Sequence, residues 1–126
     1  FLCEIQEDLP CLCFDPDKMK QVCINLIDNA VKYTPSGGRV TLQAFSEAEN
    51  LVVKICDTGK GIAEEEIPHL FERFFRSESI TEKIRGTGLG LPIVKEIIEA
   101  HSGNIEIKNI RPSGLEAIFR LPLYHV

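Results

Sequence analysis

The chain has 126 residues, of which 44% are hydrophobic and 26% are charged, and its formal net charge is −5. This length suits one domain with a sizeable core, and the composition is that of an ordinary globular protein. The net acidity argues against a surface for nucleic acid or anionic membrane, and no apolar run approaches the roughly 20 residues of a transmembrane helix. We expect residues 1–126 to form one cytoplasmic domain that contacts neither nucleic acid nor membrane.

The cysteines are scattered through the first half of the chain. There are five of them, and they form no C-x-x-C pair. A zinc site is therefore not expected, and free thiols in a reducing compartment are the simpler interpretation.

Apolar residues at intervals of three and four predict three helices. The first starts at Asp15-Pro16, a pairing typical of a helix N-cap and first turn, and it ends before residue 35. A short helix is predicted over residues 62–76. Another should begin at Pro92 and stop at Gly103, because glycine commonly ends a helix.

Alternating apolar and polar residues predict strands that come in hairpins. Residues 40–44 and 51–55 form the first pair, and 105–109 with 115–121 form the second. Residues 77–86 are polar and aperiodic, so we expect a mobile loop there. Hairpins with helices between them predict an α+β fold, a two-layer sandwich with helices on one face of a mostly antiparallel sheet.

The first predicted helix carries a polar stripe beside its apolar one. Gln21, Asn25, Asn29 and Lys32 fall on one narrow face at 100° per residue. Oxygen ligands at helical spacing suit Mg²⁺, which takes its other ligands from waters and phosphates. A solvated helix face is the plainer alternative and, on this stripe alone, the more common one.

Asp57 follows the predicted strand 51–55, where the chain leaves the sheet. A carboxylate there can accept a hydrogen bond from the exocyclic amine of adenine, and Gly59 and Gly61 would let the backbone approach the base. A simple turn after a strand is an alternative explanation for Asp-Thr-Gly.

A second glycine pair, in Gly86-Thr87-Gly88-Leu89-Gly90, leads directly into the helix near Leu91. Glycines before a helix N-terminus present free N–H groups to phosphates. The spacing matches neither the P-loop nor the dinucleotide-binding fingerprint, so both of those nucleotide sites are excluded.

Four stretches in this order resemble the N, G1, F and G2 boxes of the ATP-binding domain of sensor histidine kinases. They are Asn25–Pro35, Asp57–Ile62, Phe71–Arg76 and Gly86–Leu91. The resemblance covers about residues 9–122 and implies a mobile lid over bound ATP and Mg²⁺. It implies Asn25 as the principal metal ligand, with Asn29 contacting phosphate or a metal-bound water. Arg73 and Arg76 are candidates for the γ-phosphate because a guanidinium matches phosphate oxygens bidentately, and Arg76 is preferred, with a plain surface arginine as the alternative. The implied ATP-binding residues are Asn25, Asn29, Lys32, Tyr33, Asp57, Gly59, Gly61, Ile62, Arg73, Arg76, Thr87, Gly88, Leu89, Gly90 and Leu91.

Two departures refine this hypothesis. Related ATPases of the superfamily have a water-activating Glu four residues before the metal-binding Asn, whereas Gln21 has no basic pKa, so slow hydrolysis is expected. None of His69, His101 and His125 lies in the context of a phosphoacceptor. We therefore expect the acceptor to lie in a separate dimerisation domain of the parent protein, with a response regulator downstream.

Three other functions stay open from the sequence. An anti-sigma-type serine kinase shares the glycine loops but generally lacks a Phe71–Arg76 stretch, which counts against it. A nucleotide-gated docking module without phosphoryl transfer is compatible with all four boxes. A gyrase- or chaperone-like ATPase is disfavoured by Gln21.

Overall fold

The computed structural model describes residues 2–5, 15–34, 36–72, 90–110 and 113–123. The described elements are β1 (Leu2–Ile5), α1 (Pro16–Tyr33), β2 (Val40–Glu47), β3 (Asn50–Asp57), the 3₁₀ helix η1 (Glu64–His69), α2 (Gly90–Ala100), β4 (Asn104–Asn109) and β5 (Leu115–Pro122). The strands form one sheet in the order β1-β2-β3-β5-β4. All neighbours are antiparallel except β1 and β2, which are parallel.

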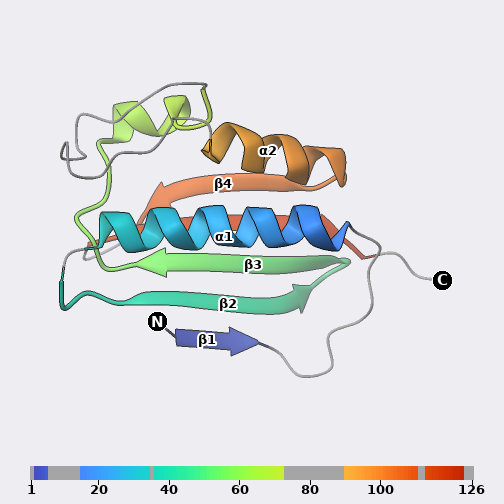
Figure 1. The fold of residues 1–126 in the computed structure, drawn as a ribbon, viewed down its shortest axis with the longest axis horizontal. Helices are drawn as coiled ribbons and strands as arrows, with labels where there is room; N and C mark the ends of the chain where they lie inside the picture. Colours follow the sequence, from blue (N-terminus) through green and yellow to red (C-terminus); the bar gives the residue numbers. More distant parts are fainter. Residues whose placement is uncertain (1, 6–14, 35, 73–89, 111–112, 124–126) are drawn as a thin grey trace.

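The two α-helices lie side by side on one face of this sheet (Figure 1). Helix α1 packs on β2 and β3, and α2 packs on β4 and β5. Buried side chains from both helices and from strands β2, β3 and β5 meet in the main core, which comprises Met19, Val22, Leu26, Ala30, Val40, Leu42, Val53, Ile55, Val94, Ile97, Ile98, Phe119 and Leu121. The predicted α+β, two-layer fold is confirmed.

Helix α1 starts as the sequence predicts. The Asp15 carboxylate accepts hydrogen bonds from the N–H groups of Asp17, at 3.0 Å, and Lys18, at 3.2 Å. Pro16 occupies the first turn, where the missing N–H leaves no intrahelical partner unpaired. The helix ends at Tyr33. Among the described residues, no helix has both the length and the apolar character needed to cross a membrane.

The Asp15 cap gives a first testable prediction. We expect Asp15→Ala to lower the free energy of unfolding by about 1 kcal/mol, because two N–H groups of the first turn lose their acceptor. Urea unfolding followed by circular dichroism would measure this loss. The exposed Lys20→Ala, on the same helix, should stay within about 0.5 kcal/mol of the wild type. Equal losses in the two variants would contradict the capping role.

The helix predicted over residues 62–76 is shorter and of a different type. The structure has a 3₁₀ helix over Glu64–His69 with Pro68 inside it. Proline has no N–H and its ring obstructs the carbonyl four residues earlier, so an α-helix cannot run through this position. Residues 73–76 lie outside the described part of the chain, as does the predicted mobile loop over residues 77–86.

Strand β1 was not predicted. It has four residues, and its partners Thr41–Ala44 belong to a strand far along the chain. The predicted hairpins are both present, and the first is longer than expected, because β2 runs to Glu47 and β3 begins at Asn50. The connection between the two strands is therefore only Ala48 and Glu49.

Candidate functional site

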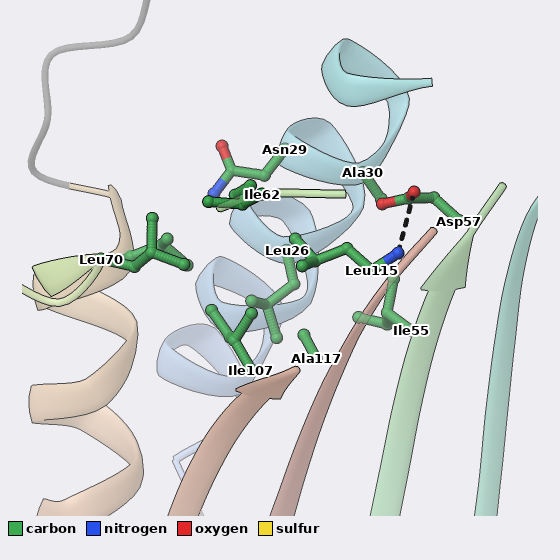
Figure 2. Close-up of a pocket in the computed structure, with 11 residues that line it drawn as sticks. Leu26, Asn29, Ala30, Ile55, Asp57, Ile62, Leu70, Ile107, Leu115 and Ala117 are labelled. Carbon is green, nitrogen blue, oxygen red and sulfur yellow. Dashed lines mark hydrogen bonds between the residues drawn. The ribbon is translucent and has the colours of Figure 1, made fainter. Parts of the chain in front are cut away.

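Three strand ends lie together at one end of the sheet and form the floor of a pocket. Strand β3 ends at Asp57, β5 begins at Leu115, and β4 ends at Asn109, which pairs with Leu115. Helix α1 forms one wall and the segment after β3 forms another (Figure 2). The lining residues are Leu26, Asn29, Ala30, Ile55, Asp57, Ile62, Leu70, Leu91, Ile107, Leu115 and Ala117. The pocket is thus mostly apolar, with one carboxylate and one amide in its lining.

Asp57 is the buried polar group of this pocket, with 3% of its surface exposed. Its Oδ1 accepts hydrogen bonds from two main-chain N–H groups, that of Gly59 at 2.9 Å and that of Leu115 at 3.3 Å. Figure 2 shows the second carboxylate oxygen on the side of Ala30, toward α1. Two main-chain donors on one oxygen fix the orientation of the carboxylate and leave the other oxygen for a ligand.

Burial raises the pKa of Asp57 above its ordinary value of 3.8. Desolvation of the charged form is the main cause, and the two hydrogen bonds from Gly59 and Leu115 oppose it. A buried carboxylate with a perturbed pKa in an apolar pocket is a common feature of binding and catalytic sites.

The raised pKa gives a second prediction. The folded chain binds a proton at Asp57 more tightly than the unfolded chain, so the stability contributed by this group is present below pH 3.8 and is lost as the pH rises through the folded pKa. We expect wild-type protein to lose stability relative to Asp57→Asn across that window. Urea unfolding at a series of pH values would measure the difference. A difference that does not change with pH would contradict the assignment.

The turn after Asp57 is held by hydrogen bonds to Arg39, the residue before β2. The Thr58 N–H donates to the Arg39 carbonyl at 3.1 Å, and the Arg39 N–H donates to the Thr58 hydroxyl at 2.8 Å. Gly61 has φ +78°, a conformation that favours glycine. The turn delivers Ile62, which is 5% exposed, to the pocket wall.

Gly114 lets the start of β5 approach Asp57 closely. Its φ is +126°, and a Cβ added there would collide with the main-chain oxygen of Asp57. This glycine immediately precedes Leu115, whose N–H holds the Asp57 carboxylate. Only a residue without a side chain fits between these two main-chain segments.

The predicted polar stripe of α1 is divided by the structure. Asn29 lines the pocket, whereas Asn25, one turn earlier, is half-buried and is not in the lining. Lys32 is exposed and pairs with Asp28 at 3.0 Å. In the part of the chain that the structure describes, no group of three or more His, Cys, Asp or Glu side chains could hold a metal. A Mg²⁺ ion that keeps its waters and phosphate ligands needs one or two protein oxygens, which the amides can supply.

The structure brings several predicted site residues together and leaves others undescribed. Asn29, Asp57, Ile62 and Leu91 line one pocket, Gly59 donates to Asp57, and Gly61 lies beside Ile62. Gly90 is the first residue of α2. Arg73, Arg76, Thr87, Gly88, Leu89 and the side chain of Tyr33 lie outside the described residues, so their roles stay predictions.

Two groups of site residues were missed by sequence reasoning. The apolar lining includes Leu26 and Ala30, which belong to the apolar stripe of the first helix, and such a stripe predicts core packing rather than a ligand pocket. The Leu115 N–H and the Asn109 side chain belong to no sequence motif, because their place at the site depends on the register of β3, β5 and β4. An asparagine at a strand end was the one available signal for Asn109.

Known proteins share this sequence pattern and fold. A family model described as histidine kinase-, DNA gyrase B- and HSP90-like ATPase matches residues 14–125. The chain is 42% identical over 121 residues to the adaptive-response sensory kinase SasA of Rippkaea orientalis, covering 95% of this chain and 31% of that protein. It is 40% identical over 119 residues to the sensor protein KdpD of Clostridium acetobutylicum, covering 94% of this chain and 13% of that one. The chain therefore spans a third or less of the length of these curated relatives.

Solved structures agree with these relatives. The mycobacterial sensor histidine kinase MprB superposes with a TM-score of 0.87 at 30% identity, covering 99% of this chain and 86% of that one. Histidine kinase ThkA in complex with the response regulator TrrA superposes with a TM-score of 0.79 at 29% identity, covering 98% of this chain and 34% of that one.

Proposed function

This chain belongs to the histidine kinase-, DNA gyrase B- and HSP90-like ATPase family, and on that premise we propose that it is the ATP-binding catalytic domain of a two-component sensor histidine kinase. The observation that carries the proposal is the buried Asp57 carboxylate, oriented by two main-chain N–H groups inside an apolar pocket. Relatives named as a sensory kinase and as a sensor histidine kinase, each 42% identical to most of this chain, support the kinase branch of the family.

We propose that the pocket holds the adenine of ATP. The second oxygen of Asp57 would accept from the exocyclic amine of the base, which distinguishes adenine from guanine at a buried polar contact. Leu26, Ile62 and Leu115 supply apolar surface for the faces of the base. Exclusion of water from the pocket by the bound base would strengthen the Asp57 contact, because it removes competing hydrogen bonds.

The amides of α1 would lie near the phosphates and their metal. We propose Asn25 and Asn29 as the oxygen ligands of Mg²⁺ and of its waters. The position of Asn29 in the pocket lining supports a contact closer to the nucleotide for this residue than for Asn25. Bound Mg²⁺ would neutralise phosphate charge during transfer. Arg73 and Arg76 stay our proposed contacts for the γ-phosphate.

The rest of the signalling reaction needs partners. We propose that the γ-phosphoryl group passes to a histidine of a dimerisation domain in the parent protein, and from there to a response regulator. The complex of ThkA with its response regulator supports the second partner.

A reducing cytoplasm suits the free thiols of Cys23 and Cys56.

Calorimetric titration with a non-hydrolysable ATP analogue, with and without Mg²⁺, tests the binding step. We expect tight binding that weakens without Mg²⁺ and in Asn25→Ala and Asn29→Ala. Asn104→Ala is a matched control, because this exposed asparagine lies at the far end of β4. No binding by the wild type would contradict the proposal.

Phosphotransfer tests the second step. Radiolabelled ATP and the domain would be mixed with the dimerisation domain of a relative such as WalK of Bacillus subtilis, to which this chain is 42% identical over 111 residues. Acid-labile, alkali-stable label on that domain is the expected result. Tight ATP binding with transfer to a serine-bearing partner would favour the serine kinase instead, and no transfer to any acceptor would favour a docking module.

A further inference from the structure

Asn109 makes three hydrogen bonds across the site from the end of β4. Its Oδ1 accepts from the Ile62 N–H at 2.9 Å, and its Nδ2 donates to the Ile62 carbonyl at 2.6 Å and to Glu64 Oε1 at 2.9 Å. The side chain therefore pairs with both main-chain groups of one residue, as a neighbouring strand would. Only one orientation of the amide satisfies both groups, so Asn109 fixes Ile62 in position and in direction.

Gly61 and Asn109 are fitted to each other. A Cβ on Gly61 would collide with Asn109 Oδ1, so the turn leaves the space that the amide occupies. The positive φ of Gly61 turns the chain so that the N–H and carbonyl of Ile62 both reach Asn109. A glycine at this turn thus serves the contact with β4 as well as the bend.

Two paired residues of neighbouring strands, Asn109 of β4 and Leu115 of β5, hold the two ends of the Asp57–Ile62 turn. Asn109 pairs with Leu115 in the β4–β5 register, and the Leu115 N–H holds the Asp57 carboxylate. Asn109 holds Ile62 at the other end. Asp57 and Ile62 both line the pocket, so their separation depends on these two neighbouring residues.

We infer that Asn109 is a positioning residue for nucleotide binding, which sets the place of Ile62 relative to Asp57 and so the shape of the base pocket. The inference rests on the proposed function of this pocket. The contact with Glu64 extends the effect to η1, which leads on to the lining residue Leu70. Asn109 itself is not in the pocket lining and acts through Ile62.

Three variants test the contact chemistry. Asn109→Ala removes all three hydrogen bonds. Asn109→Asp keeps an acceptor for the Ile62 N–H but places a carboxylate against the Ile62 carbonyl and Glu64. The double variant Asn109→Asp with Glu64→Gln exchanges the amide and the carboxylate, so a donor and an acceptor face each other again at this pair.

Two readouts separate positioning from general stability. Hydrogen exchange of the Ile62 amide is measured by NMR without nucleotide, and the Kd for a non-hydrolysable ATP analogue is measured by calorimetry. We expect Asn109→Ala and Asn109→Asp to lose protection at Ile62 and to bind roughly tenfold more weakly, the factor that one net hydrogen bond represents. The exchange variant should recover part of the affinity lost in Asn109→Asp.

Matched controls complete the test. Asn104→Ala removes an exposed asparagine from the same strand and should keep the wild-type Kd. Val52 is 1% exposed and lies outside the pocket lining. Val52→Ala would leave a cavity there, which should lower Tm without changing the Kd. Wild-type affinity and Ile62 protection in Asn109→Ala would overturn the inference, as would equal loss of affinity in Val52→Ala. If the wild type binds no nucleotide, the proposed function fails, while the exchange of Ile62 still reports whether Asn109 holds the turn.

Discussion

Asp57→Asn should weaken ATP binding by about 100-fold or more. To keep the Gly59 and Leu115 N–H groups satisfied, the asparagine must turn its Oδ1 toward them. Its NH₂ group then faces the pocket as a donor, opposite the amine of adenine, which is also a donor. Two buried donors without an acceptor cost about 1–3 kcal/mol each, and roughly 2.8 kcal/mol is a factor of 100.

Calorimetry with the same ATP analogue measures this loss, and a thermal melt checks that the variant is folded. Asp17→Asn is the matched control, because Asp17 is an exposed carboxylate in the first turn of α1, far along the helix from the lining residues Leu26 to Ala30. That variant should bind as the wild type does. A guanine nucleotide, which offers a carbonyl in place of the amine, should lose less affinity in Asp57→Asn than ATP does. Unchanged ATP affinity in Asp57→Asn would remove Asp57 from the base contact.

Gly114→Ala should lower the free energy of unfolding by about 3 kcal/mol or more. The residue has φ +126°, where a side chain is strained by about 1–3 kcal/mol, and its Cβ would also collide with the main-chain oxygen of Asp57. Relief of the collision would move β5 away from β3 and lengthen the hydrogen bond from the Leu115 N–H to Asp57. Urea unfolding measures the loss.

Gly37→Ala separates strain from collision. Gly37 also has a positive φ, +88°, but a Cβ there would meet no atom within 4 Å among the described residues. We expect a loss of about 1 kcal/mol from backbone strain alone. If the two alanine variants lost the same stability, the close approach of Gly114 to Asp57 would not be a significant constraint.

Elements with their own periodicity were predictable from the sequence. Helix α1 has a strong cap at Asp15 and a long apolar stripe, and the two hairpins have clear alternation, so local signals agreed with the final packing. Strand β1 carries four residues and is stabilised by pairing with β2, which local sequence does not reveal. The 3₁₀ geometry of η1 follows from Pro68, whose effect was underestimated.

The site was predictable where a side chain bears the chemistry. Asp57 and Asn29 belong to recognisable stretches, and both line the pocket. The groups that orient them were not predictable. The main-chain N–H at position 115 would be present with any residue except proline, and the Asn109 amide reaches Ile62 only because β4 ends beside the start of β5. Such contacts follow from strand register, which local sequence patterns do not reveal.

The main chain and the side chain of Leu115 have different roles in the pocket, so the pocket can be redesigned chemically. Its main chain orients the Asp57 carboxylate, while its side chain, 7% exposed, forms part of the pocket surface. The size of this side chain can therefore change while the polar anchor is retained. Leu115→Ala would create a hole that accommodates an adenine analogue enlarged by an alkyl group, which the wild type excludes. A selective inhibitor of the altered domain, with an unaltered copy as control, would then report on this one domain among its many relatives in a cell.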